Sequence, residues 1–198
     1  MHADNCSGQN KNRWVLQYLA WRACCGMDAT ARISFMIAGH TRSYCDGGFG
    51  LVKRNLRSKE VHTPAQMVEV VRTCAASGGI KPVVPSQVAW YDWKAFLELY
   101  FDKGCPAILS HQIFSFSAET PGTVLMRTSS ASHVSIEREL ARAFNPPMTT
   151  EDWHNSVLQL DEFRQVPSGI PETRMTYLKE KVFPQARGTR QEEFTTPL

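Results

Sequence analysis

Two acidic residues stand where a chain could build a metal-dependent site. Asp4 follows a short segment that reads as the end of a strand, and Asp46 opens a helix 42 residues later. Mg²⁺ and Mn²⁺ are hard cations that prefer carboxylate oxygens, and two such ions about 3.5–4 Å apart can clamp the attacking and leaving oxygens of a phosphodiester. Asp4 and Asp46 are therefore candidate catalytic residues and metal ligands for cleavage or strand transfer.

Basic residues follow both acids in the sequence. Lys53 comes two helical turns after Asp46, so that its side chain falls on roughly the same helix face and could meet a phosphate. The first sixty residues hold 9 Lys/Arg against 4 Asp/Glu, or +5, and the remainder holds 13 against 15, or −2. This asymmetry places a polyanion-binding surface near the two acids. DNA is the expected partner, and the candidate contacts are Lys11, Lys53, Arg54 and Arg57.

Each of these residues also has a structural interpretation. Asp4 with Asn5 can form an Asx turn or a helix cap, and Asp46 can cap its helix with a favourable dipole interaction. His40 can be a metal ligand, a phosphate contact or an anchor of the loop before Asp46. Asn5 and His40 are assigned supporting roles, and the basic residues can equally be an ordinary solvated helix face.

The remaining composition excludes several classes of protein. The six cysteines show no Cys-x-x-Cys spacing, which argues against a structural zinc site. The first residues show no basic segment followed by an apolar one, so nothing in them suggests secretion. No apolar stretch approaches the length that spans a bilayer. We expect a soluble intracellular protein with reduced thiols, with the nucleus as one option for its location. No local Ser/His/Asp or Cys/His signature indicates nucleophilic catalysis.

The elements around the two acids follow an α/β order. A strand ends at Asp4, a helix spans 12–26, a buried strand spans 31–38, and a helix follows the loop after it. The 12–26 helix is apolar on most sides, so it should lie between a sheet and a further element. Its aromatic residues, Trp14, Tyr18 and Trp21, are assigned to the core in preference to a base-stacking surface.

The second part of the chain predicts an α+β arrangement. Its expected helices span 64–76, 92–101, 150–159 and 172–182, a short strand spans 83–89, and a β-hairpin joins 111–117 to 123–128. The last dozen residues are expected to be disordered. The expected division is a first domain over 1–78, an extension with the hairpin over 79–145, and a loosely packed helical tail over 146–198.

The motif around the acids resembles a known family. Asp4-Asn5, followed by Asp46 with an aromatic residue three positions on and a lysine seven positions on, is similar to the pattern of mariner-type transposases. The sequence from Asp4 to Asn12, together with Gly39-His40-Thr41, looks closer still to a transposon-derived eukaryotic family without an assigned activity. The resemblance implies an RNase H-like fold of the DDE-type transposases and integrases, with Mg²⁺ or Mn²⁺ as cofactor, and covers residues 1 to about 75 well.

In that fold, the first of three acids lies on a strand upstream of the Asp4 strand. The chain starts three residues before Asp4, so we expect an incomplete RNase H-like fold and an incomplete DDE/D-type nuclease or transposase site. The open sheet edge predicts self-association or pairing with the missing N-terminal half. The alternative is a domesticated DNA-binding or protein-interaction module without catalysis. An enzyme of unrelated chemistry has no candidate residues in this sequence.

Overall fold

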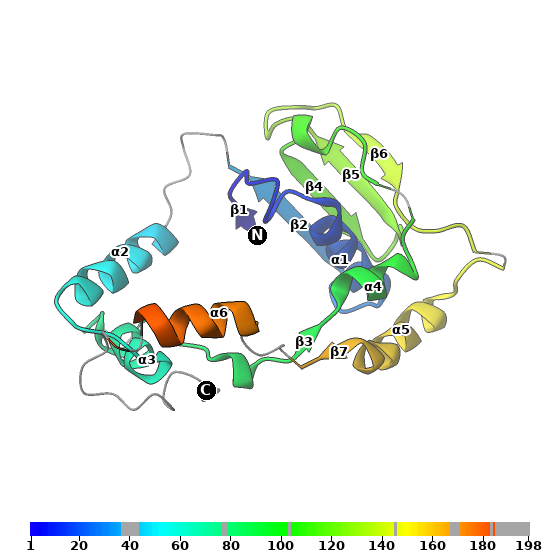
Figure 1. The fold of residues 1–198 in the computed structure, drawn as a ribbon. Helices are drawn as coiled ribbons and strands as arrows, with labels where there is room; N and C mark the ends of the chain where they lie inside the picture. Colours follow the sequence, from blue (N-terminus) through cyan, green and yellow to red (C-terminus); the bar gives the residue numbers. More distant parts are fainter. Residues whose placement is uncertain are drawn as a thin grey trace. The chain divides into compact units, whose positions relative to one another are not determined.

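The structure is a computed structural model that describes residues 1–36, 44–76, 79–102, 104–144, 146–166, 171–182 and 184. Its contacts separate two compact units. The first comprises Met1–Thr41 and Tyr91–Arg164, and the second comprises Arg42–Trp90 and Gln165–Leu198. Figure 1 shows the elements coloured in chain order.

The first unit is built on a mixed sheet of five strands in the order β1-β2-β4-β5-β6. The parallel pair is β1 with β2, and the other neighbours are antiparallel. The strands span His2–Ala3 (β1), Thr30–Phe35 (β2), Ile113–Ser117 (β4), Thr123–Arg127 (β5) and Ile136–Glu139 (β6). A mixed α/β architecture is thus confirmed, and β1 and β6 are the edge strands of this sheet.

The two faces of the sheet have opposite character because side chains alternate along each strand. On one face Ile33 lies opposite Phe114, which in turn lies opposite Met126, and all three are buried. On the other face Arg32 lies opposite Ser115, to whose Oγ its Nε donates a hydrogen bond of 3.1 Å. The apolar face is therefore the one that carries the core.

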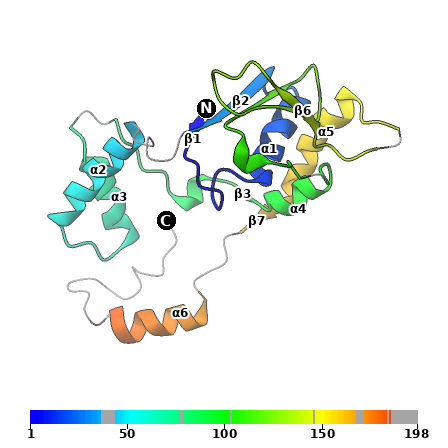
Figure 2. The same ribbon diagram turned by 90° about the horizontal axis from the view of Figure 1, so that it is seen from above.

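Three helices contribute further residues to this core. They are α1 (Arg13–Cys24), α4 (Trp93–Glu98) and α5 (Thr150–Gln159). The first packs against β2 and β4 and also contacts α4 and α5, as Figures 1 and 2 show together. Trp21 of α1 is buried, and its Nε1 donates to Ser156 Oγ at 2.8 Å. The expectation that the first helix lies between a sheet and further elements is confirmed.

Local sequence signals explain where α1 begins. Asn12 is its N-cap, because the Asn12 Oδ1 accepts hydrogen bonds from the backbone N–H groups of Trp14 at 3.0 Å and Val15 at 3.1 Å. These two N–H groups would otherwise have no intrahelical partner. The Asn12 side chain also donates from Nδ2 to the Gln9 carbonyl at 3.0 Å, which ties the preceding turn to the helix.

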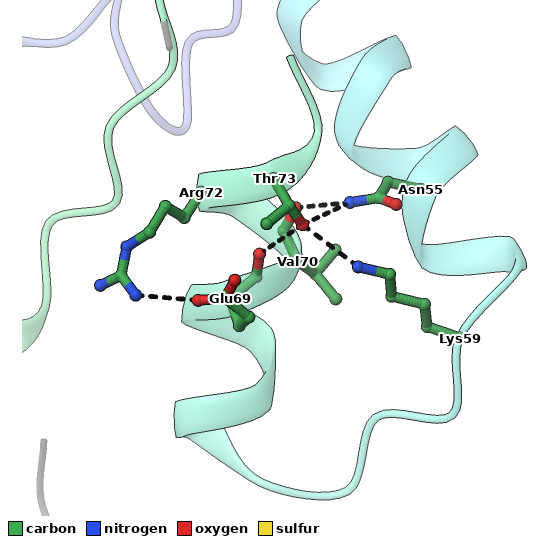
Figure 3. Close-up of polar contacts among 6 residues, drawn as sticks. All are labelled: Asn55, Lys59, Glu69, Val70, Arg72 and Thr73. Atoms are coloured by element: carbon green, nitrogen blue, oxygen red, sulfur yellow. Dashed lines mark hydrogen bonds and ion pairs between the residues drawn. The ribbon is translucent and has the colours of Figure 1, made fainter. Parts of the chain in front are cut away.

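The second unit contains α2 (Tyr44–Arg57), α3 (Pro64–Thr73) and α6 (Glu172–Tyr177), the last followed by a π-helical turn over Leu178–Val182. Thr63 and Gln66 form the predicted capping box of α3, with Pro64 in its first turn. Asn55 of α2 donates from Nδ2 to the Val70 carbonyl at 2.8 Å and to Thr73 Oγ1 at 3.2 Å (Figure 3). This amide holds α2 against α3.

The hairpin and most helices were predicted correctly, and the exceptions have physical causes. The expected strand at 83–89 is wrong: residues Pro85–Gln87 form a 3₁₀ turn, which the Gln87 side chain closes by accepting from the Val84 N–H at 3.2 Å. The short strand β3 (Trp90–Tyr91) comes directly afterwards and pairs with β7 (Arg164–Gln165). Further 3₁₀ turns span Ile108–Ser110 and Leu160–Phe163.

The contacts group the chain differently from the three expected segments. The hairpin of β4 and β5 was assigned to a separate extension, but β4 pairs along its whole length with β2 in one sheet. The strand β6 was not predicted, because Ile136 is its single apolar residue. The other three residues of β6 are charged and exposed, so the sequence shows no alternation of apolar and polar residues there. The boundaries at residues 78 and 145 stay a prediction, and the last dozen residues lie outside the described ranges.

Candidate functional site

Asp4 lies at the carboxyl end of β1, directly before the turn that leads into α1. Its Oδ1 accepts hydrogen bonds from the Cys6 N–H at 3.2 Å and from Asn10 Nδ2 at 2.6 Å. The Cys6 carbonyl accepts in turn from the N–H groups of Asn10 and Lys11, both at 2.9 Å. The Asp4 carboxylate therefore stabilises this turn through its side chain, which agrees with the interpretation of Asp4 as an Asx-turn residue. Its Oδ2 is not used by these bonds.

The position of Asp4 is also one that α/β proteins use for ligands. The β1–α1–β2 segment is a parallel strand–helix–strand unit, and ligands of open α/β sheets bind beyond the carboxyl ends of such strands. Asp4 is half-buried and Asn5 is exposed. Both residues can therefore be reached from solvent at the edge of the sheet.

Asp46 lies exposed in the first turn of α2, where a carboxylate interacts favourably with the helix dipole. It belongs to the second compact unit, whereas Asp4 belongs to the first. The expected convergence of the two carboxylates stays a prediction. His40, the expected supporting residue between them, lies outside the described residues.

The donor set around Asp4 does not by itself fit a divalent cation. Within the described ranges, no group of three or more His, Cys, Asp and Glu side chains lies close enough together to hold a metal ion. One oxygen of Asp4 is already committed to the turn through Cys6 and Asn10. We therefore derive no reaction step through Mg²⁺ or Mn²⁺ from these residues.

Lys11 was expected to contact nucleic acid, but the structure places its side chain in the interior. Its side chain is only 2% exposed, and its Nζ donates to the Leu109 carbonyl at 3.0 Å. The ammonium also lies 5.4 Å from the centre of the Phe35 ring. Burial lowers the pKa of Lys11 from its ordinary value. Lys11 thus joins the turn to a segment 98 residues away and does not present a surface charge.

The other three expected contacts lie on an exposed face of α2. Lys53, Arg54 and Arg57 are all exposed, and in the part of the chain that the structure describes none of them forms an ion pair. Phe49, one helical turn before Lys53, is 66% exposed on the same side of the helix. Lys53, Arg54 and Arg57 form the basic face of α2.

The sequence profile of one known family matches residues 1–134. The chain belongs to this family. Its description is "Domain of unknown function (DUF7869)". The matched region contains Asp4, the basic face and the strands β1, β2, β4 and β5. No curated protein and no solved structure matches the chain.

Buried thiols in the DUF7869 region are not suited to nucleophilic chemistry. Burial raises the pKa of Cys24 to about 12 and that of Cys105 to about 11, and it also raises the pKa of Cys25. A thiol with a raised pKa holds little of the reactive thiolate at neutral pH.

Among the described helices, none is long and apolar enough to cross a bilayer.

Sequence reasoning missed one feature of the DUF7869 region. Of the three aromatic residues assigned to the core, Trp21 is buried, and Trp14 and Tyr18 are half-buried and pack against the same core. With Trp93 they line an open hollow of about 380 Å³. Helical spacing alone does not predict the hollow, because Trp14 and Tyr18 lie on the same apolar stripe of α1 as the buried Trp21.

Proposed function

We propose that this DUF7869 protein is a DNA-contacting domain of transposase-derived, RNase H-like ancestry, and that it binds DNA phosphates through the basic face of α2. The observation that carries the proposal is the exposure of Lys53, Arg54 and Arg57 without ion pairs among the described residues. Unpaired surface cations release the counterions of DNA, which supplies most of sequence-independent affinity.

The spacing of these cations suits a phosphate backbone. Lys53 and Arg57 are one helical turn apart, about 6 Å along the helix axis, and Arg54 lies beside Lys53. Asn55 faces the other way and bonds α3, so the contact with α3 does not cover the basic face. A helix anchored on one side and cationic on the other is a simple surface for backbone contacts.

The proposed ancestry rests on different residues. The parallel β1–α1–β2 unit places Asp4 at the carboxyl end of an edge strand, in the sequence context that resembles the mariner-type pattern. The antiparallel strands continue the sheet only on the far side of β2. A further strand could therefore join at β1, next to Asp4, and the resemblance implies an upstream strand that carries the first acid.

Salt-dependent binding tests the DNA proposal. We expect the affinity for a short duplex, measured by fluorescence anisotropy, to fall steeply with salt. Lys53→Ala, Arg54→Ala and Arg57→Ala should each lower the slope of log K against log[salt] by about one. The matched control is Arg72→Ala on α3, because Arg72 is exposed but already paired with Glu69 at 2.8 Å. A flat salt response, or equal effects of all four variants, contradicts the proposal.

A second candidate function is metal-dependent phosphodiester cleavage, which the position of Asp4 at the carboxyl edge of the sheet favours. We propose that the chain alone is inactive, since the described residues do not assemble a metal site. The test is nicking of supercoiled DNA with Mg²⁺ or Mn²⁺. Metal-dependent nicking that Asp4→Asn abolishes would replace the binding proposal with an enzymatic one.

A further inference from the structure

The hollow on the first unit has an unusual lining for a surface depression. Three aromatic residues line it, together with one aliphatic residue and two amide residues: Trp14, Tyr18, Trp93, Val15, Gln9 and Asn12. The rings of Tyr18 and Trp93 meet edge to face, with centres 4.8 Å apart and planes at 74°. Two rings at this angle form adjoining apolar walls.

Two residues of the lining, Trp14 and Trp93, also carry an indole N–H donor. In the part of the chain that the structure describes, neither the Trp14 nor the Trp93 indole N–H has an acceptor, and neither nitrogen is sealed from solvent. By contrast, the Trp21 indole donates to Ser156. An indole nitrogen can only donate, so the complementary group on a ligand is an acceptor such as a carbonyl oxygen.

Charge is nearly absent from the hollow. No residue that lines it is ionised, and two cations beside it are already engaged: Arg22, next to Tyr18, pairs with Asp28 at 2.7 Å, and Arg13 lies next to Trp14. The Arg13 guanidinium lies 4.0 Å from the centre of the Trp14 ring, and its Nη2 lies 3.7 Å from Glu98 Oε1. A nucleic-acid strand would bring phosphates that need unpaired cations, so the lining favours an uncharged ligand.

We propose that the hollow binds a proline-containing segment of a partner protein in the polyproline II conformation. Such a segment has no internal hydrogen bonds, so its carbonyl oxygens are available to the two indole N–H groups. Its proline rings pack on aromatic walls, and its preformed shape loses little entropy on binding. The site is distinct from the basic face, and this inference does not depend on DNA binding.

The direct probe is an oligoproline peptide of about ten residues, titrated into the full-length protein. The readout is the indole N–H signals in a ¹H–¹⁵N NMR spectrum, in which the five tryptophans of the chain give separate peaks. We expect the Trp14 and Trp93 peaks to shift and the Trp21 peak to stay, because Trp21 is buried and already bonded. A glycine–serine peptide of equal length should shift none of them.

Variants separate the rings from the donors. Trp14→Ala should weaken peptide binding by about tenfold or more, and Trp14→Phe should have a smaller effect because it keeps a ring and removes the N–H. Tyr18→Phe should bind almost normally, since the Tyr18 hydroxyl accepts from Arg22 at 3.3 Å and faces that residue. An unshifted Trp21 peak shows that each variant is folded.

The matched control is Tyr177→Ala in α6. Tyr177 is a half-exposed aromatic residue that also carries a stacked arginine, with Arg174 Cζ 4.8 Å from its ring centre, but it does not line the hollow. It should leave peptide affinity unchanged. No shift of Trp14 and Trp93, equal losses for Tyr177→Ala and Trp14→Ala, or shifts with single-stranded DNA in place of the peptide would overturn the inference.

Discussion

Two glycines with left-handed backbones differ in what surrounds them. Gly26 has φ +70° and Gly122 has φ +74°, but a Cβ at Gly26 would meet nothing within 4 Å, whereas a Cβ at Gly122 would overlap the Cβ of Ala141. Gly26→Ala should cost about 1–2 kcal/mol from backbone strain alone. Gly122→Ala should cost at least about 1 kcal/mol more, because strain and overlap add. Urea denaturation measures both, and equal losses would contradict the overlap.

The buried ammonium of Lys11 predicts a dependence of stability on pH. Burial lowers the pKa of Lys11 in the folded state below its ordinary value of 10.5, so the unfolded chain binds the proton more tightly. The free energy of unfolding contributed by this residue must then rise as pH increases through the folded-state pKa towards 10.5. Lys11→Met removes the titrating group and keeps the length of the side chain.

We therefore expect the stability of the native protein to increase relative to Lys11→Met as the pH rises towards 10.5, the ordinary pKa of the residue. Other groups, such as cysteines and tyrosines, titrate in both proteins and cancel in the difference. Urea denaturation at a series of pH values gives the two curves. Parallel curves would show that the Lys11 ammonium is not desolvated by the contacts to Leu109 and Phe35.

At the scale of elements, the Asn55 amide of α2 makes two hydrogen bonds to α3. Asn55→Ala removes the hydrogen bonds to the Val70 carbonyl and to Thr73 and should destabilise the helix pair by about 1 kcal/mol. Faster hydrogen exchange of the α2 and α3 amides would report the loss. The matched control is Lys59→Ala: Lys59 bonds the same Thr73 hydroxyl at 3.1 Å, but from an exposed side chain. Comparable exchange in both variants would contradict the role of Asn55.

Elements with their own start signals could be predicted from the sequence. Asn12 is the N-cap of α1, and Thr63 and Gln66 form the capping box of α3. The turn between β4 and β5 is short and contains proline and glycine. Each of these signals acts through bonds within a few residues, which a sequence displays directly. The failures have the opposite cause. Residues 83–89 are apolar enough for a strand, but a turn built around Pro85 interrupts them.

The candidate site was predictable only where it is local. Exposure of the basic face follows from the spacing of its cations along one helix. Burial of Lys11 depends on the Leu109 carbonyl, far along the chain, and the opening of the aromatic hollow depends on where Trp93 of α4 meets α1. Such contacts depend on tertiary packing between distant segments, so composition and periodicity do not predict them.

At the scale of the whole molecule, the first unit is discontinuous in sequence. Its strand β2 ends at Phe35 and pairs with the central strand β4, which begins at Ile113, while most of the second unit lies between them. All the described residues of the sheet and of α1, α4 and α5 belong to the first unit. The sheet therefore needs both flanking segments but not the 42–90 segment for its own hydrogen bonds.

Replacing residues 42–89 with a flexible glycine–serine linker should thus leave a folded first unit. We expect cooperative urea unfolding and a near-ultraviolet circular dichroism spectrum that keeps the signal of the Trp21, Trp93 and Phe96 cluster, because its ring contacts lie within that unit. The control is a chain that ends at residue 112, which keeps β1, α1 and β2 but removes the partner strand β4. It should not unfold cooperatively, since β2 loses its antiparallel neighbour and the buried face of the sheet loses Phe114 and Phe116. A linker variant that unfolds without cooperativity would show that the first unit depends on the second for stability.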